Sequence, residues 1–496
     1  MTILRSEGAG ETSSAGFYNN AVTRSLRFNG LHGGDNPVLA RNFLAPAGTG
    51  KKWIFAFWIK PCAFGNDTAI ITAGSNATNY SAITFAANGD LNATDALHIV
   101  AVASNSNQYA LQTKALFRDS TNWQHICIAF DSTQTTERNR MAIFVNGKLF
   151  NTTTTAANHF EVFTDYPSAD TVPTYFNANG LTHRIGVFNV VGDAGNLEGY
   201  LADMYFLDDQ SIFTNSVADP TANSTFINND KDTLVTFCEQ SNGIAIPKAY
   251  TGATSTYGNN GFHLDFTANG VATTAEGTDA NTNIGDDKSG NGHNFSVTDI
   301  EATDVMLDTP ENNFATMLGG GLAEPTDDQS YSGAGTYSEG NLKLVGTSTW
   351  SNGSSNFGVT SGKWYAECRI GAKAGSGYIR FGMRTRPTRT YDEYFWLDNG
   401  TGQIDATTSP YSSRVGTYTG GDILQIALDL DNNALYFGKD NTWQNSATAS
   451  EIAAGTTTNA FVASSTIIPT GDGHAYFFYC QPHSSTSNIT WNFGQD

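Results

Sequence analysis

Four pairs of adjacent acidic residues are the first places to look for acid–base chemistry. Neighbouring side chains of a strand point to opposite faces, so adjacent carboxylates make poor acid/base pairs. Retaining glycoside hydrolases need two carboxyl groups about 5–5.5 Å apart, which alternate positions of one strand supply, and the sequence has no such acidic strand. We therefore predict no catalytic residue and no enzymatic activity. The four pairs are Asp208-Asp209, Asp286-Asp287, Asp327-Asp328 and Asp392-Glu393.

The segment 286–292 combines carboxylates with an amide and two glycines. Clustered carboxylate and amide oxygens are the ligands that calcium prefers, and Asp286, Asp287 and Asn291 are the candidate ligands. Asx residues also close turns by bonding to their own backbone. Both interpretations stay open, so no cofactor is required and calcium is possible. Residues 429–433 (Asp-Leu-Asp-Asn-Asn) favour a hairpin turn over a metal site.

Residues 384–396 mix arginine and aromatic side chains in an otherwise acidic chain. Arginine and tyrosine are frequent anchors of interfaces. We predict a loop that enters a strand here and makes a ligand or subunit contact. The candidate contact residues are Arg386, Arg389, Tyr391, Tyr394 and Trp396.

The chain is acidic, with 26 Lys+Arg against 47 Asp+Glu and a net charge of −21. This charge repels phosphate backbones, so no nucleic-acid partner is expected. No window is apolar enough to span a bilayer, and residues 1–14 lack the features of a signal peptide, so we expect synthesis in a cytoplasm without membrane insertion. The five cysteines lie far apart without metal spacing and are expected to be small apolar fillers.

Short alternating apolar runs predominate, and no segment keeps helical periodicity over three turns. In residues 51–61, Trp53, Phe55, Phe57 and Ile59 fall on one strand face and Trp58 on the other. Residues 140–150 are typical of a hairpin closed by Asn-Gly at 146–147. The pattern predicts an all-β protein.

The order of strands in residues 21–212 resembles a laminin-G or concanavalin A-like lectin domain. The motifs are an aromatic strand at 53–59, W-x-H-I-x-I-x-F-D at 123–131, V-N-G at 145–147, I-G at 185–186 and G-x-L-x-D-x-x-F at 199–206. The resemblance implies an antiparallel β-sandwich of jelly-roll type.

Residues 213–337 are rich in Asn, Thr, Asp and Gly, and we predict a connector of short strands and loops there. They contain G-F-x-L-D-F at 261–266, D-x-S-G-N-G-x-N-F at 287–295 and L-D-T-P-x-N-N-F-A-T at 307–316. This combination resembles structural proteins of tailed bacteriophages, in which it joins a lectin-like domain to a variable C-terminal part.

Residues 338–496 resemble a SPRY domain. The motifs are S-G-K-W-Y-x-E at 361–367, G-D-x-L-x-x-A-L-D-L-D-x-x-x-L-Y-F at 421–437 and a terminal N-F-G-Q. That family is also a concanavalin-like sandwich and binds partners through its loops. The expected fold is therefore two concanavalin-like antiparallel β-sandwiches joined by an Asn/Gly-rich connector.

The resemblances imply a virion structural protein of a tailed phage, displayed at the particle surface as a tail fibre or adhesin that binds host cell-surface polysaccharide. Residues 1–20 are the expected anchor to other virion proteins, and the fibre interpretation implies a homo-oligomer, taken as a trimer. Two alternatives stay open. One is a purely structural head or tail decoration protein, and the other is a polysaccharide depolymerase that uses the first sandwich.

Overall fold

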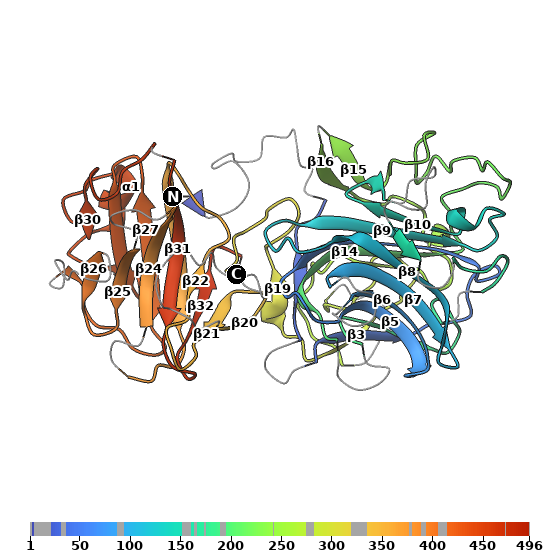
Figure 1. The fold of residues 1–496 in the computed structure, drawn as a ribbon, viewed down its shortest axis with the longest axis horizontal. Helices are drawn as coiled ribbons and strands as arrows, with labels where there is room; N and C mark the ends of the chain where they lie inside the picture. The colour runs from blue at the N-terminus through green and yellow to red at the C-terminus, as the bar shows by residue number, and fades with distance from the viewer. Residues whose placement is uncertain are drawn as a thin grey trace. The chain divides into compact units, whose positions relative to one another are not determined.

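The computed structural model describes most of the chain and divides it into two units, Ser13–Glu311 (the first unit) and Met1–Thr12 with Asn312–Asp496 (the second unit). In the described residues, strands predominate and α1 (Ala449–Ala454) is the one α-helix (Figure 1). The predicted all-β fold is confirmed. None of the described helical segments is long and apolar enough to cross a membrane. The described residues are 2–3, 21–30, 36–86, 94–150, 160–162, 166–172, 175–188, 195–241, 243–273, 282–318, 335–375, 379–387, 393–404, 414–471 and 473–495.

The described part of the first unit contains two eight-stranded antiparallel sheets and a two-stranded one, β15-β16. Sheet I has the strand order β11-β10-β9-β4-β14-β2-β19, with β17 paired to β14. Sheet II has the order β12-β8-β7-β6-β5-β13-β3-β18. The strands of sheet I are β2 (Ser25–Asn29), β4 (Lys52–Pro61), β9 (Gln124–Asp131), β10 (Met141–Val145), β11 (Lys148–Leu149), β14 (Glu198–Asp208), β17 (Phe262–Leu264) and β19 (Val305–Met306). Those of sheet II are β3 (Val38–Asn42), β5 (Thr68–Asn76), β6 (Asn79–Phe85), β7 (Ala96–Ala103), β8 (Ser106–Leu116), β12 (Phe160–Val162), β13 (Thr182–Ile185) and β18 (Ser296–Thr298).

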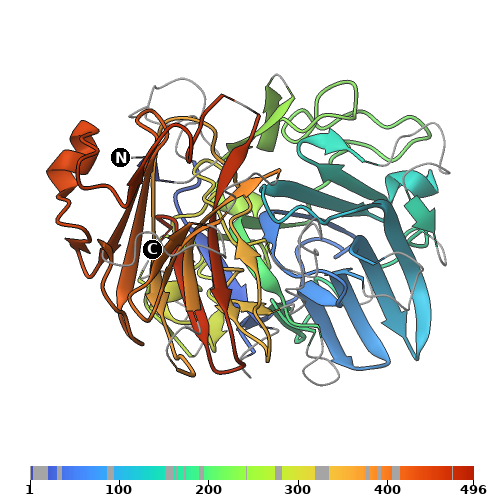
Figure 2. The same cartoon turned by 60° about the vertical axis from the view of Figure 1, so that its left-hand side comes forward.

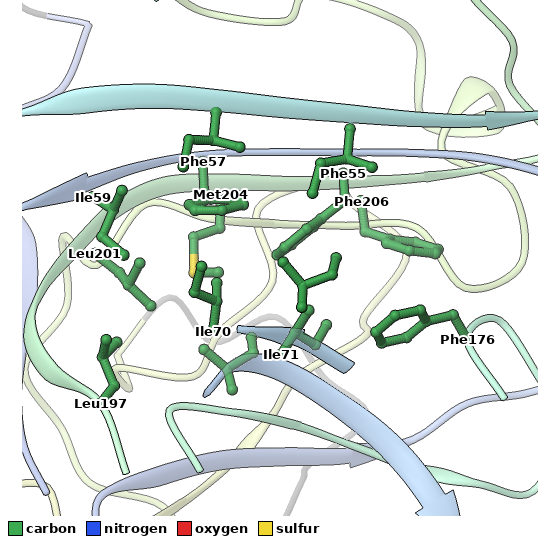
Figure 3. Close-up of a cluster of buried hydrophobic side chains, with 14 of the residues drawn as sticks. Phe55, Phe57, Ile59, Ile70, Ile71, Phe176, Leu197, Leu201, Met204 and Phe206 are labelled. Atoms are coloured by element: carbon green, nitrogen blue, oxygen red, sulfur yellow. The ribbon is translucent and has the colours of Figure 1, made fainter. Parts of the chain in front are cut away.

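The main core of the first unit lies between these sheets (Figure 3). As predicted, Trp53, Phe55, Phe57 and Ile59 of β4 all point into it. They meet sheet II residues such as Ile71. Full burial of each large apolar side chain contributes about 1.5–3 kcal/mol, so alternation on β4 determines which face of the strand points inward.

Residues 213–258, the first part of the expected connector 213–337, cover the outer face of sheet I. A second buried cluster joins Ile54 and Ala56 of β4 to Phe226, Phe237 and Tyr257 from this segment. The aromatic residues of the segment are spaced irregularly, so no period-two pattern revealed their burial. The short elements here and nearby are η1 (Glu137–Asn139), β15 (Phe237–Ser241), β16 (Ile244–Lys248), η2 (Thr254–Thr256) and η3 (Ala302–Asp304).

Hydrogen bonds of Asp308, in the L-D-T-P motif, connect the last residues of the first unit to sheet I and to Trp123 beside it. The Asp308 carboxylate accepts hydrogen bonds from Lys60 Nζ and Trp123 Nε1, each at 2.8 Å. The Asp308 backbone carbonyl accepts a third from Ser25 Oγ. The side chains of Lys60 and Asp308 are both fully buried, so this is an ion pair in the protein interior.

His183 makes the first unit sensitive to acid. Burial lowers the pKa of His183 to about 3, and its Nε2 accepts a hydrogen bond from the Asn177 backbone N–H. The unfolded chain binds a proton near the ordinary histidine pKa of about 6.5, so unfolding takes up this proton between that pH and about 3. We expect the free energy of unfolding to fall as pH drops through this window, and less steeply in the His183→Gln variant. Urea titrations at pH 7 and about pH 4.5 measure both slopes, and equal slopes would contradict this assignment.

Two further antiparallel sheets form the second unit, and the short β1 joins one of them in parallel. Phe381 packs against Trp491 and Phe437 between the sheets, with ring centroids 5.3 and 6.0 Å apart. The α1 helix lies outside the nine-stranded sheet, called sheet III (Figure 2), and packs Ile452 on Tyr436 and Ala427. Sheet III contains β1 (Thr2–Ile3), β20 (Thr336–Ser338), β21 (Lys343–Val345), β23 (Lys363–Ile370), β27 (Ile423–Asp429), β28 (Ala434–Lys439), β29 (Thr442–Trp443), β30 (Val462–Ala463) and β32 (Asn488–Asn492). Sheet IV contains β22 (Gly353–Ser354), β24 (Ile379–Arg386), β25 (Glu393–Leu397), β26 (Gly402–Ile404) and β31 (Ala475–Pro482).

Several local predictions are confirmed. Asn146 and Gly147 both have positive φ and close the β10–β11 hairpin, as a type I′ turn requires. Asp429 lies at the start of the β27–β28 turn, and its carboxylate stabilises the turn by accepting two hydrogen bonds from Asn432. All five cysteines are free and buried, as expected of apolar fillers. Of the predicted anchor 1–20, β1 alone is described, and it pairs in parallel with β23.

Candidate functional site

The candidate cation ligands lie together, and their oxygen atoms are used by the chain itself. The buried Asp287 carboxylate accepts hydrogen bonds from the backbone N–H groups of His263, Ser289 and His293 at 2.8–2.9 Å, and from Ser289 Oγ at 2.7 Å. A carboxylate has about four acceptor positions, so these bonds occupy it.

Asp286 and Asn291 are held in the same way. Asp286 Oδ2 accepts from the Thr282 and Asn283 backbone N–H groups at 2.7 and 2.9 Å. The Asn291 amide donates to the Gly258 and Gly261 carbonyls. Across the described ranges no group of three His, Cys, Asp or Glu side chains could hold a metal ion. The geometry favours the turn interpretation, in which Asp287 links this turn to His263 of β17.

The described residues of the arginine-rich segment 384–396 are largely shielded from solvent. Tyr394 and Trp396 are buried, where Tyr394 Oη donates to the Ile467 carbonyl and Trp396 Nε1 to the Gly416 carbonyl. This corrects the expectation that both side chains are available for contact, since alternation along β25 turns them towards the core. Arg386 is half-buried at the end of β24. Arg389 and Tyr391 lie outside the described residues.

Two further arginines share a face of β24 with Arg386. The guanidinium of Arg380 lies 4.4 Å from the Trp350 ring and 4.7 Å from the Phe395 ring, and that of Arg384 lies 5.1 Å from Tyr479. Their spacing at even intervals in β24 was a signal that the sequence reasoning missed. Cation–π contacts of this kind hold the charges against the sheet.

The outer face of sheet II carries a polar row that sequence reasoning also missed. Strand register places Thr84 opposite His98, His98 opposite Gln112, and Gln112 opposite Glu161, on four successive strands. We call these four positions the His98 row. Cross-strand partners lie about 4.5–5.5 Å apart at Cβ, so hydroxyl, imidazole and amide groups form a line across the sheet.

Small and aromatic residues flank the His98 row on the same face. The next row consists of Thr72, Ala82, Val100 and Ala110. Beyond it, Tyr80 meets Phe188 edge-to-face, with ring centroids 5.2 Å apart. Tyr80, Phe188 and His98 are half-buried, whereas Thr84, Gln112 and the four residues of the next row are buried. The accessible parts of His98, Tyr80 and Phe188 can contact a hydroxylated ring.

Comparison with known proteins places this face within a recognised family segment. Residues 32–205 match the family model described as the Concanavalin A-like lectin/glucanases superfamily. No curated protein matches the chain.

Two solved structures are similar to parts of the chain. One is a native heptameric SAP-like pentraxin from Limulus polyphemus, at 16% identity and a TM-score of 0.27, with 38% of this chain and 77% of that chain covered. The other is the SPRY domain of human HERC1, at 16% identity and a TM-score of 0.23, with 30% of this chain and 87% of that chain covered. The match over residues 32–205 and the two antiparallel sheets of the first unit agree with a concanavalin-like β-sandwich.

Proposed function

We propose that this protein binds glycans without hydrolysing them, as a surface protein of a tailed-phage particle that recognises host polysaccharide. The observation that carries the proposal is the His98 row on the outer face of sheet II, inside the lectin-domain match. Among its members with described side chains, the half-buried His98 imidazole is the accessible polar group, and Tyr80 and Phe188 are half-buried aromatic rings on the same face, a combination that suits a sugar.

The virion assignment rests on the motifs of residues 260–316. In the structure, residues 260–311 complete the first unit through Asp287 and Asp308, and the last motif continues into the second unit at Asn312. We propose a tail-fibre or adhesin location, with other virion proteins and host polysaccharide as partners and a homotrimer as the assembly. The net charge of −21 supports a role that does not involve nucleic acid.

A depolymerase is the second candidate, because the register places one acidic residue, Glu161, in the His98 row. Hydrolysis needs a second carboxyl group within about 5–9.5 Å. At the described positions of this row the other members are Thr84, His98 and Gln112, which supports binding over hydrolysis.

The test measures retention and hydrolysis together. Purified full-length protein is incubated with intact host cells and with their extracted glycans, and both bound protein and new reducing ends are measured. We expect retention without new reducing ends. New reducing ends would favour the depolymerase, and the absence of both would contradict glycan binding and favour a decoration protein.

The His98→Ala/Gln112→Ala variant locates the site. We expect about a tenfold loss of affinity, because the variant removes the hydrogen bonds of the His98 imidazole, worth about 0.5–1.5 kcal/mol each, together with its buried cross-strand neighbour Gln112. Gln108→Ala removes an exposed amide of β8 outside the row and should bind normally. Thermal midpoints check that the variants are folded, and unchanged affinity in the folded double variant would exclude this row.

A further inference from the structure

Sheet III of the second unit has a polar row of its own. Register places Asn492 opposite Glu367, Glu367 opposite Gln425, and Gln425 opposite Gly438, which in turn lies opposite Trp443. These five positions, the Glu367 row, cross β32, β23, β27, β28 and β29. The row places an amide, a carboxylate, a second amide and an indole in a line on one face of the sheet.

Hydrogen bonds hold the centre of the row in one arrangement. Gln425 Nε2 donates to Tyr365 Oη at 2.7 Å and to Asn441 Oδ1 at 3.2 Å. Gln425 Oε1 accepts from the Asn441 backbone N–H at 2.8 Å, and Tyr365 Oη donates to Glu367 Oε1. Groups fixed in this way lose little conformational entropy when a ligand binds.

The glycine in the row gives the indole its position. A Cβ at Gly438 would lie 3.1 Å from Trp443 Cε3 and 3.1 Å from Gln425 Oε1. The absent side chain therefore lets the Trp443 ring lie close to the backbone of β28, beside the Gln425 amide. Trp443 and Tyr365 meet at an interplanar angle of 62°, with ring centroids 6.3 Å apart.

The row packs beside α1 on the outer face of sheet III, with Gln425 buried and its neighbours partly accessible. Trp443 and Tyr365 pack on the buried cluster that includes Ile452 of α1. Both rings stay half-buried, as do Glu367 and Asn492, and Asn441 is exposed. Aromatic rings anchored on one side and accessible on the other offer surfaces against which the C–H face of a sugar can pack.

We propose that the Glu367 row is a second carbohydrate site, which takes a neutral, hydroxyl-rich oligosaccharide. Sugar hydroxyls donate to the Glu367 carboxylate in charge-assisted hydrogen bonds. The amides of Asn492 and Asn441 complement them. Glu367 and the exposed Asp440 disfavour an anionic ligand, since like charges brought together cost free energy. An acidic ligand would have to bind mainly through Arg369, which is exposed in the next row.

This site lies in a different unit from the His98 row, and it extends the proposed glycan binding without depending on that row. One chain would then bind polysaccharide at two places. Two linked sites raise the strength of attachment because the second binding event becomes intramolecular.

Calorimetry of the full chain with neutral gluco-, galacto- and manno-oligosaccharides, and with a polyuronate as the acidic probe, tests the site. We expect Glu367→Gln and Trp443→Ala each to weaken binding of a neutral oligosaccharide about tenfold, as loss of an anchor residue does at interfaces. Trp350→Ala removes a half-buried tryptophan outside the row and is the control. Glu367→Gln keeps the shape of the side chain, so its effect does not depend on a variant that fails to fold.

The outcomes separate this inference from the proposed function. Neutral binding that persists in the His98→Ala/Gln112→Ala variant and is lost in Glu367→Gln supports the second site, even if the first is wrong. Neutral binding unchanged in folded Glu367→Gln and Trp443→Ala overturns the second site and leaves the His98 row untouched. Binding of the polyuronate alone, or of no probe, also overturns it.

Discussion

Replacing Asp308 by alanine should lower the free energy of unfolding of the first unit by about 3–5 kcal/mol, because it leaves a buried charge without its partner. The Lys60 ammonium and the Asp308 carboxylate are 2.8 Å apart and fully buried. Alanine also removes the acceptor for Trp123 Nε1. A typical domain is stable by only about 5–15 kcal/mol, so this loss is a large part of the total.

Urea denaturation of the full chain measures the Asp308 effect, and two other variants define its cause. Lys248→Ala breaks the exposed pair with Glu239 and should change stability by less than about 1 kcal/mol. Lys60→Met/Asp308→Leu should recover much of the loss, because an apolar pair of similar volume removes both buried charges. An Asp308→Ala variant no less stable than Lys248→Ala would show that the pair has no stabilising role.

Changing both polar rows together should have the largest effect on attachment to cells. If each row binds glycan, the variant that combines His98→Ala, Gln112→Ala and Glu367→Gln loses both intrinsic affinities and the linkage between them. Linking two sites can raise avidity by a factor of about 10²–10⁴ over the affinity of one site. We expect retention on host cells to fall by at least about 10²-fold, far more than in either single-row variant.

Flow cytometry of cells incubated with labelled protein measures this attachment over a range of concentrations. The matched control combines Gln108→Ala with Trp350→Ala, which lie in the first and second units outside the rows. A combined loss no larger than the bigger single-row loss would mean that only one row contacts the cell. Equal loss in the control variant would assign the effect to folding.

Residues 213–311 of the expected connector 213–337 show where prediction from the sequence stopped. Their polar composition indicated a connector, yet Phe226, Phe237 and Tyr257 are buried over sheet I, and Phe262 and Phe295 enter the main core. A polar segment with few aromatic residues can still be packed when those residues meet an existing apolar face. No periodicity in the segment itself reveals that face.

The candidate sites show a similar limit. The Arg and Tyr content of 384–396 was visible, but strand alternation buries Tyr394 and Trp396 and leaves Arg380 and Arg384 to share a face with Arg386. The polar atoms of the acidic motif at 286–292 do lie close together. The Asp287 carboxylate, however, already accepts hydrogen bonds from backbone N–H groups of its own turn and of His263.

The sequence by itself determined the local elements of this protein: the all-β pattern, the inward face of β4 and the Asn146-Gly147 turn. Each depends on residues within a few positions of one another, whose side-chain alternation and backbone preferences act over short distances. Only the tertiary structure decided the two polar rows and the Lys60–Asp308 pair. His98 and Gln112, or Glu367 and Trp443, become neighbours through strand register, and register depends on how distant segments fill a shared core.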